Sequence, residues 1–142
     1  MKNTACKTLI TLSLVLIALV PAYAQQTSMT VTIPVAFTVE QTVLPAGDYV
    51  VTHPSPKAIA LKRVGGPETL VALTNYTAYT ATSHMLQTPR LIFHRYGSQY
   101  FLAQAWMPNS DQGYEFYASA REIRVARDGG QDVVELAVLA KK

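Results

Sequence analysis

The sequence predicts an all-β, mainly antiparallel fold: a small barrel or sandwich of about seven short strands with one short C-terminal helix. Three observations predict this class. Apolar and polar residues alternate with a period of two from Met29 to Val39, as in a half-buried strand. Gly and Pro pairs interrupt the chain at short intervals, as turns between strands require. Gly97-Ser98 separates two aromatic-rich runs, the pattern of a two-residue hairpin loop.

A signal-peptide helix is expected ahead of this domain. Lys2 and Lys7 precede an apolar run from Leu9 to Val20, the arrangement of a basic n-region followed by an h-region. Pro21 closes the run, which is well short of the ~20 residues that a spanning helix needs. The segment therefore predicts export and not a permanent membrane anchor.

The cleavage site is expected after Ala24. Ala22 and Ala24 supply the small-x-small pattern that a signal peptidase accepts. The predicted organisation is a signal peptide over residues 1–24 and a single β-rich domain over residues 25–142, with no stable membrane span after cleavage. We expect the mature protein in the periplasm or outside the cell.

Cleavage changes the composition of the chain. The mature chain keeps 118 of the 142 residues, 10 of the 12 basic residues and all 9 acidic ones, so its net charge is near +1. Cys6, the only cysteine, is lost with the leader. A nearly neutral domain without clustered basic residues argues against a nucleic-acid partner, and a domain without thiols has no disulfide and no thiolate metal site.

The first elements are strands joined by a turn. The alternating run from Met29 to Val39 is the first strand, and Pro34 within it suggests an edge position or a bulge because proline cannot donate to the ladder. Leu44 to Gly47 suits a type I turn, with Pro second and Gly fourth. It leads into a second strand over residues 48–52.

Two further strands follow. His53 to Pro56 breaks the second strand, and Ala58 to Val64 forms a third that ends at Gly65-Gly66-Pro67. Thr69 to about Tyr76 is a fourth strand. The Thr- and Ser-rich residues 77–87 are expected to form a long loop or a frayed edge strand.

The hairpin spans Pro89 to Met107. A type II′ turn at Gly97-Ser98 pairs Tyr96 with Gln99, Arg95 with Tyr100, His94 with Phe101, and Phe93 with Leu102. One face would then carry Leu91, Phe93, Arg95, Tyr100, Leu102, Gln104 and Trp106, and the other Ile92, His94, Tyr96, Phe101 and Ala103. Neither face is simply polar, so both are expected to be at least partly covered.

The C-terminal part contains the helix. After a loop over residues 108–113, Ser119 and Glu122 fit a capping box that opens a short helix over residues 119–127. The rival interpretation is a hairpin, because Ile123 and Val125 alternate with polar residues and Asp128 is followed by two glycines. Residues 132–139 form the last strand.

No motif predicts catalytic chemistry, a metal or a cofactor. His53, His84 and His94 lack the spacing of metal ligands, and no Gly-x-Ser-x-Gly elbow is present. His94, opposite Phe101 in the predicted hairpin, is expected to be a hydrogen-bonded structural imidazole.

The candidate ligand-binding residues are Arg95, Tyr100, Gln104 and Trp106. Together they could stack on and hydrogen-bond a small molecule or glycan at the mouth of a barrel. The structural alternative is ordinary cross-strand packing of aromatic residues in a hairpin, which is the favoured interpretation.

Four motifs in a fixed order carry a resemblance over most of the mature chain. They are Val31-x-Ile33-Pro34-x-x-Phe37-x-Val39, Leu44-Pro45-Ala46-Gly47-x-Tyr49-x-Val51, Phe93-His94-Arg95-Tyr96-Gly97-x-x-Tyr100-Phe101-Leu102-x-x-x-Trp106, and Ser119-x-x-Glu122. The chain resembles a group of small exported β-rich proteins of Gram-negative soil bacteria. The resemblance implies a charged helix after Ser119 and carries over no catalytic residue.

The expected function is a non-enzymatic periplasmic or extracellular binding or structural module. Two alternatives stay open at this point. A small secreted hydrolase would need two carboxylates across a cleft, and an outer-membrane-associated β-barrel would need eight strands of ~10 residues.

Overall fold

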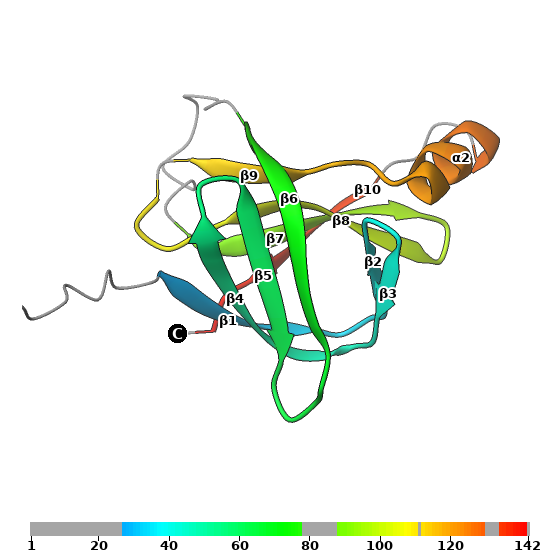
Figure 1. Cartoon of the computed structure of the whole chain (residues 1–142). Helices are drawn as coiled ribbons and strands as arrows, with labels where there is room; N and C mark the ends of the chain where they lie inside the picture. The colour runs from blue at the N-terminus through cyan, green and yellow to red at the C-terminus, as the bar shows by residue number, and fades with distance from the viewer. Residues whose placement is uncertain (1–26, 78–87, 111, 130–133, 142) are drawn as a thin grey trace, which may run out of the picture.

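The computed structural model describes residues 27–77, 88–110, 112–129 and 134–141, which form ten strands and one helix, α2 (Ala120–Gly129) (Figure 1). The strands are β1 (Ser28–Ile33), β2 (Phe37–Val39), β3 (Thr42–Leu44), β4 (Gly47–Ser55), β5 (Ala58–Arg63), β6 (Thr69–Thr77), β7 (Arg90–Tyr96), β8 (Gln99–Trp106), β9 (Gly113–Phe116) and β10 (Val134–Leu139). The predicted all-β class with one C-terminal helix is confirmed. The predicted signal peptide, with Ala22 and Ala24, and residues 78–87 of the predicted loop lie outside the described residues.

The strands form one mixed, mostly antiparallel sheet that folds over on itself as a sandwich. Its order is β1-β4-β5-β6-β9-β8-β2-β3, with β7 paired to β8 and β10 paired to β7. The parallel pair is β2 with β8, joined at Thr38 and Phe101. In the described ranges, β1 meets the end of β10 through an isolated bridge between Val31 and Ala140. The barrel is therefore not closed by a continuous ladder.

The first predicted strand is divided in two at Pro34. β1 ends at Ile33 and pairs with β4, whereas β2 begins at Phe37 and pairs with β3 and β8. The predicted alternation holds in β1, where Met29, Val31 and Ile33 are buried on one side, but all three residues of β2 are buried. Pro34 was expected at an edge or in a bulge of one strand; it instead follows the last residue of β1, and the chain crosses there from one layer of the sandwich to the other.

The predicted break at His53 to Pro56 is a bulge and not the end of the strand. β4 continues to Ser55, and its register against β5 shifts between Thr52 and Ser55. A bulge leaves one residue outside the ladder, which accommodates a proline within a paired strand. Pro54 is exposed at this point.

The hairpin of β7 and β8 has the predicted turn and the predicted register next to it. Gly97 has a φ of 60°, and all four predicted pairs from Tyr96–Gln99 to Phe93–Leu102 are present. The register then shifts between Ile92 and Phe93, so that Ile92 pairs with Gln104. Ala103 is the extra residue of this β-bulge, which the sequence does not predict.

Two short strands were not predicted. β3 forms a hairpin with β2, and Glu40 in the turn between them has a φ of 54°. The Glu40 carboxylate accepts a hydrogen bond from the Leu73 N–H at 3.2 Å, which satisfies a donor on the edge of β6. β9 lies between β6 and β8 and joins the two layers of the sheet.

The helix interpretation of residues 119–127 is confirmed, and the rival hairpin is wrong. The Glu122 N–H donates to Ser119 Oγ at 3.0 Å, which is the N-cap half of the predicted capping box. The helix runs to Gly129 and projects from one end of the sheet (Figure 1). No helix among the residues that the structure describes has the length and hydropathy of a membrane span.

The core lies between the two layers and contains three packed aromatic side chains. Phe37 packs edge-on against Tyr49 and Phe93, each with ring centroids 5.4 Å apart. The Tyr49 hydroxyl donates to the carbonyl of Pro45 at 2.6 Å, which fastens the bend between β3 and β4 to the core. Burial raises the pKa of Tyr49, and the aliphatic side chains around it are almost fully buried.

Candidate functional site

The four predicted ligand-binding residues of the hairpin do not form one cluster. Arg95 and Tyr100 are a cross-strand pair on the same side as Phe93 and Leu102. Gln104 pairs with Ile92 beyond the bulge, so it lies on the opposite side, because successive residues of a strand alternate between faces. Trp106 shares the side of Gln104. The Ala103 bulge therefore separates the four residues into two pairs.

Trp106 is packed into the hairpin. Its exposed fraction is 7%, and its indole N–H donates to Gln104 Oε1 at 3.1 Å. The Arg90 guanidinium lies over the ring, 5.2 Å from the centroid, at the distance of a cation–π contact. These contacts support the favoured interpretation of the aromatic hairpin residues as structural packing.

A second polar cluster joins α2 to the hairpin. Glu122 is 6% exposed, and its Oε1 lies 3.0 Å from Nδ1 of His94. The pKa of Tyr96 is raised by burial and by the negative charge of Glu122. Arg121 donates from Nε and Nη2 to Gln99 Oε1, at 3.1 and 2.9 Å. His94 is thus the hydrogen-bonded imidazole that the sequence predicted, and the cluster holds the helix in place.

An exposed apolar surface lies on the opposite layer, and we call it the β4–β6 outer face. Its members alternate along β4, β5 and β6 with the residues that point into the core. Val50 of β4 pairs with Lys62 of β5, and Ala60 of β5 pairs with Val71 of β6, so these residues share one face. The face consists of Val50, Thr52, Ala60, Lys62, Val64, Thr69, Val71 and Leu73. Val64, Val71 and Leu73 are 54%, 57% and 63% exposed.

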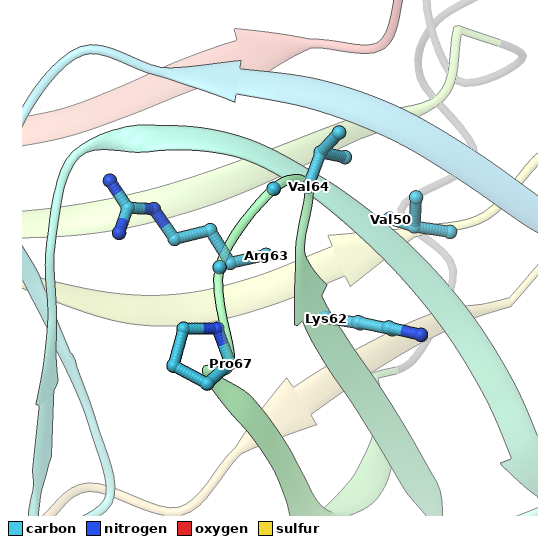
Figure 2. Close-up of a pocket in the computed structure, with 7 residues that line it drawn as sticks. Val50, Lys62, Arg63, Val64 and Pro67 are labelled. Carbon is cyan, nitrogen blue, oxygen red and sulfur yellow. The ribbon is translucent and has the colours of Figure 1, made fainter.

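One end of this face is hollowed. The hollow has a volume of about 630 Å³ and is lined by Val50, Lys62, Arg63, Val64, Gly65, Gly66 and Pro67. Figure 2 shows Lys62 and Arg63 extending in opposite directions from β5, with Val64 and Val50 on the side of Lys62. The volume falls within the range of small-molecule sites, about 300–1,000 Å³, and we call it the β4–β5 pocket.

The two cations of the β4–β5 pocket differ in their partners. Arg63 lies 3.2 Å from Glu68 Oε1 and donates to the Ala46 carbonyl at 3.4 Å. Gly66 makes room for this pair, because a Cβ at that position would collide with the Glu68 carboxylate. Lys62 is exposed and has no hydrogen-bond or ion-pair partner within the described ranges. The pocket therefore combines apolar walls with one uncompensated positive charge.

A second hollow, of about 860 Å³, lies where β1 meets the end of β10. Its walls include Met29, Pro89 and Leu139, and Lys141 lies at its rim. Lys141 Nζ is 3.0 Å from Asp48 Oδ1, so this positive charge is already compensated. A hydrogen bond from Thr32 and that from Lys141 lower the pKa of Asp48. The second hollow thus offers apolar walls without a free charge.

No group of three His, Cys, Asp or Glu side chains in the described part of the chain could hold a metal ion. The sequence did not predict the β4–β5 pocket, since Val50 and Lys62 become neighbours only through the register of β4 and β5. Val64 beside Gly65-Gly66-Pro67 was the available signal: an apolar residue at a tight turn. No family model, no curated protein and no solved structure matches the chain.

Proposed function

We propose that this protein is an exported, non-enzymatic binding module, periplasmic or extracellular, that binds a ligand with exposed apolar groups in the β4–β5 pocket. The observation that carries the proposal is the pocket itself: a hollow of about 630 Å³ bordered by Val64, which is 54% exposed. Apolar surface left in contact with water on a folded domain is a common mark of a binding site.

The chemistry of the pocket suits binding. Its walls are aliphatic side chains, a proline and two glycines, and its polar groups are the cations of Lys62 and Arg63. Because the Glu68 carboxylate neutralises Arg63, the pocket does not present a free acid and a free base that could act together. Apolar walls beside a free cation can hold a ligand by burying its apolar groups and by attracting its charge.

Binding is tested with a neutral apolar fluorophore, such as Nile red, titrated into the mature protein. Val64→Ser should weaken binding, since it removes an apolar wall of the pocket. Val43→Ser is the matched control, because Val43 is 55% exposed but lies on β3, away from the pocket. Equal binding by wild type and both variants, or no binding by any of them, would contradict the proposal.

Export is tested separately by fractionating cells and sequencing the N-terminus of the mature protein. A chain that begins at Gln25 in the periplasm or medium would support it. Replacing Ala22 and Ala24 with tyrosine should leave the precursor uncut, because the signal peptidase pocket accepts small side chains. Retention of the uncut wild-type chain in the cytoplasm would refute export.

A further inference from the structure

We infer that the β4–β5 pocket takes a single-chain amphiphile with an anionic head, its charge on Lys62 and its apolar body on the β4–β6 outer face. The inference rests on the proposed function and adds the chemical class of the ligand. It follows from which charge in the pocket is free and from the direction in which the apolar surface continues.

Lys62 is the free charge. Lys62 lines the pocket, and its ammonium has no partner among the described residues, whereas Arg63 beside it is held by Glu68 at 3.2 Å. An anionic head group would find one unpaired cation there. A cationic head group would meet Lys62 without a facing carboxylate, because Glu68 Oε1 is paired with Arg63 and Glu68 Oε2 is buried.

The apolar surface leads away from Lys62 along β5 and β6. Lys62 pairs with Thr69, Ala60 with Val71 and Ala58 with Leu73, so Val71 and Leu73 follow on the outer face in the same direction. Four residues at about 3.3 Å each separate the level of Lys62 from that of Leu73, about 13 Å in all. An extended alkyl chain advances about 1.3 Å per bond, because bonds of about 1.5 Å form a zigzag, so about eleven carbons span this length and an eight-carbon chain spans about two thirds of it.

The face selects an extended chain. Thr69 precedes the stripe of Val71 and Leu73 on β6, and Ala60 and Thr52 lie beside it on β5 and β4. None of these three neighbours carries a charge. A branched or bulky body would touch the pocket but leave the stripe bare. A ligand with its acidic end at Lys62 and one linear apolar tail follows this stripe.

The test compares octanoate, 1-octanol and octyltrimethylammonium by displacement of Nile red from the mature protein. Octanoate should bind about two- to fivefold more tightly than octanol, the gain of one exposed ion pair. Lys62→Gln should abolish that preference and leave octanol binding unchanged. Lys57→Gln is the matched control, since Lys57 is exposed at the other end of β5. The preference should also shrink in 0.5 M salt.

Each other outcome is decisive. If octanoate and octanol displace the probe equally, the anionic head is wrong while the proposed function stands. If neither ligand displaces the probe and Val64→Ser leaves probe binding unchanged, the proposed function fails as well. If the protein binds phosphatidylglycerol vesicles through Lys62 but not octanoate, the occupant is a membrane surface and the inference is overturned.

Discussion

Replacing Trp106 with alanine should destabilise the fold by about 3–5 kcal/mol. Its side chain is 7% exposed, and a buried aromatic side chain removes about 150–250 Å² from water, which at about 25 cal/mol per Å² is about 4–6 kcal/mol. Alanine retains a small part of that burial, and the exposed part of Gln104 can exchange its lost indole partner for water. The loss should lower the urea midpoint by about 2 M at the slope usual for small domains.

Unfolding is followed by far-UV circular dichroism, because Trp106 is the only tryptophan and fluorescence would disappear with it. Trp106→Phe is the control: it keeps an apolar ring and removes the N–H that Gln104 accepts, so it should cost about 1–2 kcal/mol. A Trp106→Ala protein that unfolds within about 0.5 kcal/mol of wild type but no longer binds ligand would refute the packing argument. Trp106 would then be a ligand contact.

Three further measurements address the helix, the sheet edge and the bulge. A double-mutant cycle on His94→Ala and Glu122→Ala should give a coupling energy of about 1 kcal/mol in urea unfolding, and additive effects would show that their 3.0 Å contact does not hold α2. The hydrogen bonds to Asp48 lower its pKa, so their stabilisation is present above about pH 4 and is lost as the pH falls through the lowered folded value. The difference in urea midpoint between wild type and Asp48→Asn should therefore be larger at pH 6 than at pH 3, and a difference independent of pH would contradict this. Deleting Ala103 should keep the faces of the residues after the bulge, because Leu102 and Gln104 would then pair with Phe93 and Ile92 in a regular ladder, so the cost should stay below about 3 kcal/mol, and complete unfolding of the deletion variant would contradict this register.

Local patterns were sufficient for most strands and for the hairpin register. The alternation around Val31, the turn at Gly97 and the N-cap at Ser119 are each decided by neighbouring residues, and each has the predicted structure. Ala103 has no such local mark, because an alanine fits a regular strand as well as a bulge. The predicted faces of the hairpin were therefore wrong beyond it, and with them the single cluster of candidate residues.

The features that the sequence could not predict depend on contacts between distant segments. Glu122 was expected to reach back to its own N-cap, but His94, 28 residues earlier, lies against its carboxylate. The β4–β5 pocket likewise depends on which residue of β4 faces Lys62, and that is settled by the length of the β4 bulge. Strand β9 is short, and pairing with β6 and β8 defines it.

The single bridge between Val31 and Ala140 has a consequence for the order in which the chain folds. Val31 and Ala140 lie near opposite ends of the described chain. Bringing them together therefore has one of the largest loop-closure costs of any contact in the described fold, and the bridge is expected to form late. Until β10 has been synthesised, β7 keeps one edge of unpaired backbone groups, a template for pairing with another chain, and β1 lacks its bridge. The last eight described residues therefore protect nascent molecules from edge-to-edge association, and truncation before Val134 should produce aggregation before it produces loss of the remaining strands.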